Sequence, residues 1–425
     1  MEKIIHKKST EHLIRNKLIT SCQPGFIAKR PTLTQQLCYF EHLTKFQDNK
    51  QNCEAIYLDF TKAFDKISHR KLILVLSHFK FNKTIITWIH DFLQDRTQQT
   101  VVEGSYSSTR KVTSGVPQGS VLAPLYFVLY LESLIKDLQE HCQNIQIFAF
   151  ADDVKLLGQD QLEIKKALQI IEKWCENWNL CLQPKKSEHL SFVFSKSTNS
   201  NPLNFYISNS LIPKTNFVKD LGLTLSTNLK WAPYISKTTA KANVMSYNII
   251  RSFVSTNLSL YTGLYKTFIR PLLEYNTPIW NPDLITDIKS VEHIQRKFTR
   301  MVCQKSNTSF TNYQDRLKIL HLDTLEIRRV RFDLILMYKI YHNIIDIDFN
   351  SHFKLNIANK NYSLRGHNFK LQRNKYSTAR NRYFCERVIP TWNKLPVDVV
   401  EALNVEEFKT KLTKFDLNKI YTSKI

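Results

Sequence analysis

The sequence predicts a mixed α/β fold of the α+β kind, with short hairpins among helices in its first half and mainly helices in its second half. Three observations favour this class. The apolar run Ala55–Phe60 is typical of a buried strand. The alternating stretch Ile145–Leu157 is typical of a tight hairpin. From about Trp231 onward, apolar residues recur at helical spacing.

Composition indicates a globular protein with a polyanionic partner. The 425 residues are 43% hydrophobic and 12% aromatic, which is enough for a large core and two or three domains. The net charge of +23 favours nucleic acid, because each neutralised phosphate releases counterions; an anionic membrane surface is the competing partner. No apolar run approaches the roughly 18 residues of a membrane span. We therefore expect a soluble, intracellular protein, with nucleus and cytoplasm undistinguished and no membrane partner.

Eight cysteines are scattered without a CxxC pair. This spacing suggests neither a zinc ribbon nor a disulfide framework. We expect reduced cysteines with mostly structural roles.

The elements follow in order along the chain. A loop around Pro24-Gly25 leads into a helix through about Gln47, and the strand ending at Asp59 is followed by a helix that Ser68 can cap. We next expect a helix at 85–93, a strand at 98–103, a turn at Gly104-Ser105 and a second strand that ends at Val112. An apolar helix follows Ser120, and then come a helix at 161–178, a hairpin at 203–225, and helices at 231–270, 285–303 and 325–341.

Asp152 and Asp153 lie adjacent in the predicted hairpin turn. Neighbouring carboxylates raise each other's pKa unless a cation neutralises them, and Mg²⁺ prefers such oxygen ligands. A solvated acidic turn is the alternative. Asp59, at the end of a buried strand, also needs a cation or donors. Together the three acids are what a two-metal phosphoryl-transfer site needs.

The segment from Gly115 to Gly119 is a glycine-bounded loop before the apolar helix, and Ser120 is placed to cap that helix. The positive end of the helix dipole favours an anionic ligand at this loop. A simple turn before a core helix is the alternative. Asp65 is expected to have a capping rather than a metal-binding role.

Several blocks resemble one family. The segments IYLDFTKAFDKISHRKL, SGVPQGSVLAPLYFVLYLESL, FAFADDVKLL, LQPKKS and VKDLGLTL stand in the order and spacing of reverse transcriptases from non-LTR (LINE-type, jockey-like) retrotransposons. The similarity continues through YKTFIRPLLEYNTPIWNP, YQDRLKILHL, SLRGHNFKL and RVIPTWNKLPVDVV, so it covers nearly the whole chain.

The resemblance implies a right-hand polymerase fold, with fingers and a palm built on an antiparallel sheet, a helical thumb and a mainly helical C-terminal region. The implied boundaries are fingers at 1–58 and 81–115, palm at 59–80 and 116–235, thumb or connection at 236–310, and a basic C-terminal region at 311–425 that could bind RNA. That last region mixes cations with aromatic residues suited to RNA, namely Arg365, Lys370, Arg373, Lys375, Tyr376, Arg380, Arg382, Tyr383 and Phe384. A peripheral helix with solvated cations is the alternative.

The resemblance also assigns residues. Asp59, Asp152 and Asp153 become the catalytic, metal-binding triad for two Mg²⁺ or Mn²⁺ ions, with the backbone carbonyl of Phe60 as a further ligand. The resemblance places Phe64 under the sugar of the incoming dNTP, Gln118 and Gly119 in its binding site, and Arg30 at its triphosphate. Lys186 is implied as the proton donor to the departing pyrophosphate. The strands around Leu221-Gly222 are implied as the primer grip. The family's Gly-Arg-Ser finger pattern reads Lys29-Arg30-Pro31 here, and Gln183 replaces a commoner Asn.

The activity implied is RNA-directed DNA synthesis from a 3′-OH primer, with an RNA template, a DNA primer or target, and dNTPs as partners. An RNA-templated RNA polymerase is a second reading, which Phe64 and the Ala-Asp-Asp hairpin argue against. A catalytically inactive RNA-binding remnant is a third. We see neither the upstream endonuclease of larger family polyproteins nor a Cys/His knuckle, so we expect a chain that polymerises without cutting its own target. The oligomeric state is left open.

Overall fold

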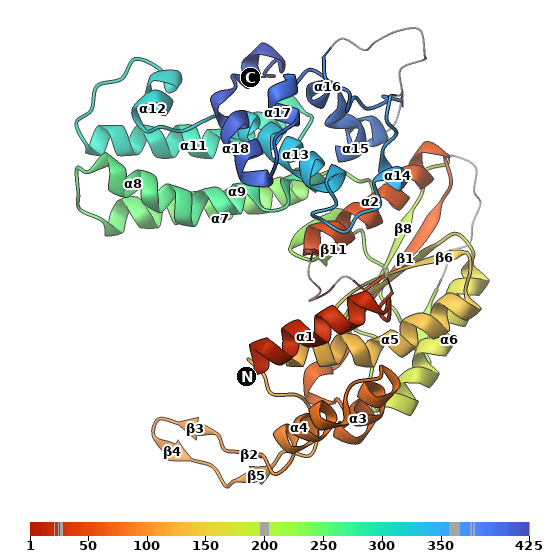
Figure 1. The fold of residues 1–425 in the computed structure, drawn as a ribbon. Helices are drawn as coiled ribbons and strands as arrows, with labels where there is room; N and C mark the ends of the chain where they lie inside the picture. Colours follow the sequence, from red (N-terminus) through yellow and green to blue (C-terminus); the bar gives the residue numbers. More distant parts are fainter. Residues whose placement is uncertain are drawn as a thin grey trace. The chain divides into compact units, whose positions relative to one another are not determined.

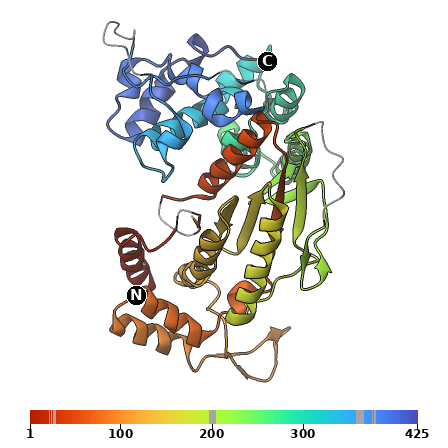
Figure 2. The same ribbon diagram turned by 90° about the vertical axis from the view of Figure 1, so that its right-hand side faces the viewer.

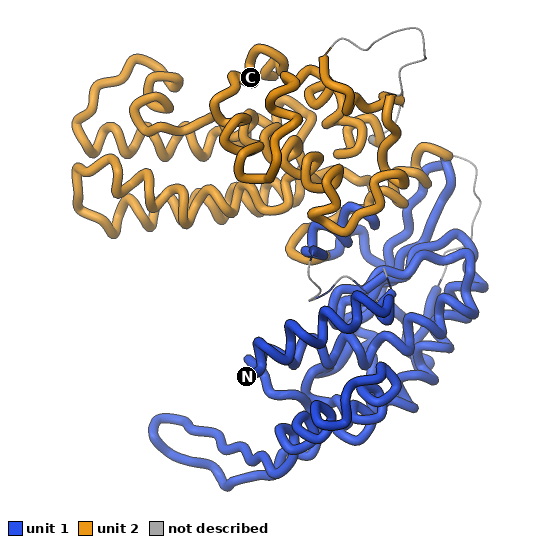
Figure 3. Tube along the Cα trace, viewed as in Figure 1, with its two compact units in different colours: residues 1–39, 50–218 blue, residues 40–49, 219–425 orange. Residues whose placement is uncertain are grey.

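The computed structural model describes residues 1–20, 22–23, 25, 29–195, 204–356, 366–374, 376 and 379–424. The chain forms two compact units, coloured separately in Figure 3. Residues 1–39 and 50–218 make up unit 1, and residues 40–49 and 219–425 make up unit 2. The four-part division into fingers, palm, thumb and C-terminal region stays a prediction.

Unit 1 is built on a four-stranded antiparallel sheet with strand order β6-β7-β1-β8. The predicted antiparallel α+β architecture is therefore confirmed. The strands of this sheet are β1 (Cys53–Leu58), β6 (Ile145–Phe150), β7 (Asp153–Gly158) and β8 (Glu188–Phe192). Three two-stranded pairs accompany them, namely β2 (Thr97–Gln98) with β5 (Arg110–Lys111), β3 (Val101–Val102) with β4 (Ser105–Tyr106), and β9 (Tyr206–Ile207) with β10 (Ser210–Leu211).

Helices cover both faces of this sheet (Figures 1 and 2). Every residue of β1 is buried, which explains why residues 55–58 are continuously apolar rather than alternating. The helices of unit 1 span α1 (Glu2–Arg15), η1 (Ala63–Asp65), α3 (His69–His78), α4 (Lys83–Leu93), α5 (Ala123–His141) and α6 (Gln161–Trp178), and α2 (Thr32–Asp48) begins in this unit.

The two faces have different coverings. Ile56 and Leu58 of β1 share a core cluster with α3, α5 and α6. On the other face, the hydroxyl of Tyr57 donates to the hydroxyl of Tyr39 on α2 at 2.8 Å. The ammonium group of Lys155, a buried residue of β7, donates to Gln35 of α2 at 3.1 Å and lies over the Tyr39 ring.

Unit 2 is mainly helical, as predicted. Its one hairpin among the described residues pairs β11 (Phe217–Asp220), which starts in unit 1, with β12 (Leu223–Ser226). Its helices span α7 (Ala232–Ser252), α8 (Leu258–Leu264), the π-helical η2 (Tyr265–Ile269), α9 (Arg270–Glu274), α10 (Thr277–Trp280), α11 (Ile285–Lys305), α12 (Tyr313–Ile319), α13 (Leu325–Tyr341), α14 (Phe349–His352), η3 (Ala379–Arg382), α15 (Phe384–Arg387), α16 (Ile389–Trp392), α17 (Val397–Val400), α18 (Val405–Lys414) and η4 (Leu417–Lys419).

Most expected elements are found within a few residues, and the helices at 161–178 and 325–341 match at both ends. Three differ. The helix expected at 231–270 is interrupted at 253–257, where Asn257 caps a new helix. The hairpin expected at 203–225 is two hairpins, with turns at Ser208-Asn209 and Leu221-Gly222; residue 203 itself lies outside the described residues. The strand expected at 98–103 divides, because Thr100 bonds to Ser107 outside the regular ladder.

Part of the expected RNA-stacking surface is interior. Arg380, Tyr383 and Phe384 are buried, and Arg380 is paired with the buried carboxylate of Glu41. A role for these three side chains in stacking bases is therefore wrong, because ring faces and cations inside the core cannot meet RNA. Arg365 and Lys375 lie outside the described residues. RNA binding by the rest of this region stays a prediction.

Among the described residues, no cysteine forms a disulfide bond, and the expected structural role of the cysteines stays a prediction. Among the described residues, no helix combines the length and the hydropathy needed to cross a lipid bilayer.

Candidate active site

The hairpin between β6 and β7 ends in a two-residue turn of Ala151 and Asp152, since Phe150 pairs with Asp153. Ala151 has a φ of 54°, in the left-handed region. A side chain with a Cβ costs roughly 1–2 kcal/mol in that conformation. The hairpin turn is therefore strained at the residue directly before the acidic pair.

The side-chain amide of Gln23 bonds to both backbone groups of Ala151. Its Oε1 accepts the N–H of Ala151 at 3.2 Å, and its Nε2 donates to the carbonyl of Ala151 at 3.3 Å. The same Oε1 accepts the N–H of Gly25 at 3.2 Å, and the carbonyl of Cys22 accepts the N–H of Ala149 at 2.9 Å. Gln23 is fully buried, so these bonds are shielded from water.

Gly25 is needed because its backbone runs against the turn. A Cβ added to Gly25 would lie 2.6 Å from the amide nitrogen of Ala151. Sequence reasoning missed both Gln23 and Gly25 as site residues. The Pro-Gly pair indicated only a loop, and nothing in the local sequence says that the loop meets a hairpin more than 120 residues away.

The backbone of Asp59 is fixed on both sides by the segment 183–187. Its N–H donates to the hydroxyl of Ser187 at 3.2 Å, and its carbonyl accepts the N–H of Gln183 at 2.8 Å. The Ser187 hydroxyl in turn donates to the carbonyl of Gln183 at 3.1 Å. Lys186 belongs to this short turn and its side chain is exposed, so the predicted lysine and the strand-end carboxylate come from adjoining backbone.

The three acids lie at one end of the sheet. Leu58 pairs with Val154, so Asp59 and Asp153 follow directly at the same end, beside the hairpin turn. Burial raises the pKa of the Asp152 carboxyl, and the nearby charge of Asp59 raises it further. Asp153 is exposed and Asp152 half-buried. Acidic residues from two distant segments therefore lie at the same end of the sheet.

Phe60 and Phe64 face the core next to Asp59. The Phe60 side chain is buried, and its backbone bridges to Leu182. The ring of Phe64 packs against Phe127 of α5 with centroids 4.9 Å apart, and the carbonyl of Phe64 accepts the N–H of Val116 at 2.9 Å. Phe64 is thus held by one core helix and by the glycine-bounded loop.

The loop from Gly115 to Gly119 is folded back onto Asp65. A Cβ on Gly115, which has a φ of 83°, would lie 2.6 Å from the carbonyl oxygen of Asp65. The Gln118 amide donates to the Asp65 carboxylate at 2.9 Å. Asp65 therefore positions this loop. Its expected capping role is wrong, because Ser68 is the N-cap residue of α3 and the Asp65 carboxylate instead accepts from Gln118. Gly119, with a φ of 87°, has open space on its side-chain face.

A cavity of about 850 Å³ opens beside this loop. Three cationic residues, Lys62, Arg96 and Lys111, line it together with Asp65 and Gln118. Arg96 donates to the carbonyl oxygens of Leu93 and Gly115, at 3.2 and 3.0 Å. The excess of positive charge suits an anionic ligand such as a nucleotide phosphate.

Helix α5 starts at Ala123, and Ser120 is not its N-cap residue, which corrects the expectation. The hydroxyl of Ser120 donates to the Glu2 carboxylate at 2.6 Å. The same carboxylate oxygen accepts the N–H groups of Val121 and Leu122, at 2.7 and 3.4 Å. The positive end of this helix does bind an anion, as its dipole predicts, and the anion is a side chain of α1.

Arg30 donates to the carbonyl of Thr20 at 3.1 Å. Its charge also lowers the pKa of Glu132, a fully buried carboxyl group of α5, but burial outweighs this effect and raises that pKa to about 7. The N–H of Thr20 donates to Glu132 at 2.7 Å. The contact of Arg30 with a triphosphate stays a prediction.

The Leu221-Gly222 turn, predicted as the primer grip, lies in unit 2. Both residues have positive φ values, 43° and 88°, as the tight hairpin there requires. The hydroxyl of Tyr275 donates to the carbonyl of Leu221 at 2.8 Å, and a Cβ on Gly222 would meet its ring at 2.9 Å. Tyr275 packing therefore leaves room only for glycine at this position.

The acidic cluster fits divalent cations of the magnesium type. Its donors are carboxylate oxygens. Burial raises the pKa of Asp152 and the charge of Asp59 adds to the rise, and a bound cation would offset both effects.

The model of one protein family, described as reverse transcriptase (RNA-dependent DNA polymerase), matches residues 1–225, which is more than half of the chain. Among curated proteins, the chain is 27% identical over 293 residues to a probable RNA-directed DNA polymerase from transposon X-element of Drosophila melanogaster, covering 66% of this chain and 31% of that protein. It is 24% identical over 319 residues to the RNA-directed DNA polymerase from mobile element jockey of the same species, covering 69% of this chain and 34% of that protein.

The chain thus spans about a third of the length of these relatives. Among solved structures, it is 11% identical to telomerase from Candida tropicalis in complex with a fragment of telomeric RNA, with a TM-score of 0.46, covering 97% of this chain and 56% of that one. The family match includes every acid of the sheet-end cluster, together with the loop from Gly115 to Gly119. The chain belongs to the reverse transcriptase family.

Proposed function

We propose that this protein is an RNA-directed DNA polymerase of a non-LTR retrotransposon, which extends a 3′-OH primer with dNTPs on an RNA template. One observation carries the proposal. Asp59, directly after β1, and Asp152, in the β6–β7 turn, lie at the same end of the sheet, although 92 residues lie between them in sequence. The family match and the relatives named as RNA-directed DNA polymerases support it.

Asp59, Asp152, Asp153 and the carbonyl of Phe60 would hold two Mg²⁺ or Mn²⁺ ions. When bound, such ions supply activation of the attacking 3′-oxygen and stabilisation of the leaving phosphate. The chain itself contributes positioning, which is most of the catalysis in phosphoryl transfer. Gln23 fixes the turn that carries Asp152, and Ser187 and Gln183 fix the backbone of Asp59.

Residues next to the acidic cluster would bind the incoming dNTP. Phe64, braced by Phe127, presents a rigid ring where a bulky side chain excludes a 2′-hydroxyl. Gln118 and Gly119 would meet the nucleotide, and Arg30 its triphosphate. Lys186, exposed beside the Asp59 backbone, would protonate the departing pyrophosphate.

The net charge of +23 supports an RNA template and a DNA primer as partners, because both are polyanions. Phosphate contacts of this kind lose affinity steeply as salt rises. The same charge is compatible with an inactive RNA-binding remnant, so activity must be measured directly.

Primer extension with the full chain tests the proposal. Incubation with an RNA template, a DNA primer, Mg²⁺ and labelled dNTPs is expected to yield extended DNA, and chelation by EDTA is expected to stop it. Incorporation of rNTPs in place of dNTPs would instead indicate an RNA polymerase. Tight RNA binding without extension in either Mg²⁺ or Mn²⁺ would indicate the inactive remnant and overturn the proposal.

A further inference from the structure

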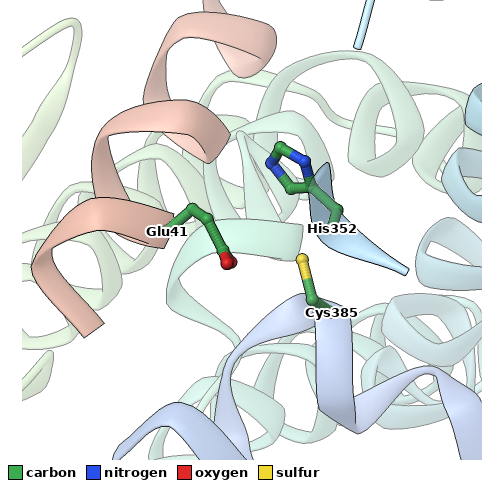
Figure 4. Close-up of side chains that lie close together, drawn as sticks. All are labelled: Glu41, His352 and Cys385. Atoms are coloured by element: carbon green, nitrogen blue, oxygen red, sulfur yellow. The ribbon is translucent and has the colours of Figure 1, made fainter. Parts of the chain in front are cut away.

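Unit 2 contains a group of metal-binding side chains that the polymerase reaction does not use. Glu41 of α2, His352 of α14 and Cys385 of α15 turn their side chains toward one another (Figure 4). One carboxylate oxygen, one imidazole nitrogen and the sulfur all lie within 4.8 Å of one another. We propose that Glu41, His352 and Cys385 form a Zn²⁺ site that fastens helix α2 to the C-terminal helices.

Two of the three donor atoms are buried without a hydrogen-bond partner. They are Oε2 of Glu41, a residue only 2% exposed, and Nε2 of His352. A buried polar atom without a partner costs about 1–3 kcal/mol. A cation shared by both atoms would satisfy them at once, and the thiol of Cys385, which is 1% exposed, supplies the third donor.

The imidazole of His352 is oriented as a metal ligand. Its Nδ1 lies 3.2 Å from the carbonyl of Asp348 and 2.5 Å from the hydroxyl of Ser351. Since that hydroxyl already donates to the Asp348 carbonyl at 2.8 Å, Nδ1 is the protonated nitrogen. Nε2 then carries the free lone pair. Backbone carbonyls orient histidine ligands in the same way in known metal sites.

The Glu41 carboxylate is held from its far side. Its Oε1 accepts from Arg380 at 2.6 Å and lies 3.1 Å from the ammonium group of Lys45. These two cations fix the carboxylate so that Oε2 faces His352 and Cys385. Because thiolate and carboxylate together cancel the charge of Zn²⁺, the bound centre is neutral and adds no net charge beside Arg380.

The chemical types of the three donor atoms favour Zn²⁺. One sulfur, one nitrogen and one oxygen suit Zn²⁺ far better than Mg²⁺, which takes oxygen ligands. Tetrahedral Zn²⁺ bonds of about 2.0–2.3 Å bring donor atoms to roughly 3.2–3.7 Å apart, so the three side chains must close by about 1 Å. Three protein ligands leave one position for water, and half-buried His352 gives the ion a path inward.

The full chain, purified without a histidine tag, provides the test. Elemental analysis is expected to find one tightly bound Zn²⁺ per chain. X-ray absorption of the zinc-loaded protein should show one sulfur at about 2.3 Å and nitrogen or oxygen ligands at about 2.0–2.1 Å. A zinc shell without sulfur, or no retained zinc, would overturn the proposal with the wild-type protein alone.

Variants and Co²⁺ spectra identify the residues. Co²⁺ is expected to give a thiolate charge-transfer band that disappears in Cys385→Ser and persists in Cys303→Ser, a buried cysteine of the same unit outside the group. Asp152→Asn should leave the band unchanged, which excludes the acidic cluster. Glu41→Gln and His352→Gln should each weaken zinc binding at least about tenfold. If the Cys385 variant does not fold, unchanged affinity in both of these variants would refute the site.

Discussion

The side-chain amide of Gln23 bonds to the N–H and the carbonyl of Ala151, the strained residue directly before Asp152. The loop that carries Gln23 is therefore hydrogen-bonded to the hairpin that carries Asp152, although 128 residues lie between these two residues in sequence. A strained turn persists only where its surroundings hold it. We infer that Gln23 positions the carboxylate of Asp152, which we propose as a metal ligand.

Replacing Gln23 with Ala is expected to reduce kcat by about tenfold or more, because it leaves two backbone groups of Ala151 without partners and lets the Asp152 carboxylate shift. Stability should fall by about 1–3 kcal/mol. Primer extension and thermal unfolding measure the two effects. The exposed Gln169 of α6 provides the control variant Gln169→Ala. If Gln23→Ala lowers the Tm but leaves kcat unchanged, Gln23 stabilises the fold without positioning Asp152.

The variant Ala151→Gly should stabilise the protein. Glycine removes a penalty of roughly 1–2 kcal/mol at a positive φ and adds about 0.5–1 kcal/mol of chain entropy, so the net gain is about 0.5–1 kcal/mol. Chemical unfolding followed by circular dichroism measures it. A loss of stability of that size would show that the methyl group of Ala151 contributes packing that outweighs the strain.

Asp152→Asn is expected to lower the extension rate by at least about a thousandfold, since one metal ligand loses its charge. RNA affinity, measured by filter binding, should change little because the amide preserves the shape of the side chain. Asp91→Asn, at an exposed position of α4, serves as control. Parallel loss of synthesis and RNA binding would assign Asp152 a structural role instead.

Phe64→Val is expected to admit rNTPs. The smaller side chain no longer fills the space under the sugar, while Phe127 and the remaining core still support the loop. Competition between dNTPs and rNTPs in primer extension measures the selectivity, and Phe64→Tyr should keep the wild-type preference. If the valine variant discriminates as strongly as the wild type, the sugar is selected by another group.

Glu132 predicts a pH dependence of stability. Burial raises its pKa from 4.5 to about 7 in the folded protein. The protonated Glu132 therefore contributes to the free energy of unfolding. This contribution is fully present below about pH 4.5 and is lost as pH rises through about 7, which lowers the free energy of unfolding by about 3 kcal/mol. Glu132→Gln cannot ionise, yet it can still accept the N–H of Thr20.

The Tm of Glu132→Gln should therefore exceed the wild-type Tm at pH 8 and match it near pH 4.5. Comparing the two proteins at each pH removes the effect of every other titrating group. Equal Tm values at pH 8 would mean that the carboxylate of Glu132 is stabilised in its charged form by Arg30 and Lys136.

Local patterns determined much of the fold. The helices at 161–178 and 325–341 follow from apolar spacing, and Asp160 and Thr324 cap them as short polar residues do. The strand at β1 and the hairpin at β6–β7 follow from runs of apolar residues and their alternation. Each of these signals lies within one segment, which is why sequence reasoning reached it.

The sequence by itself determined which residues are the candidates for catalysis, because the acids, the glycine-bounded loop and the lysine turn each lie in a short contiguous motif. Only the tertiary structure decided which distant side chains and backbone groups hold these residues in position. The support of Ala151 by Gln23, the occupation of the α5 start by Glu2 and the approach of Glu41 to Cys385 each join segments more than 100 residues apart. Such contacts depend on the three-dimensional path of the chain, and no local periodicity encodes them.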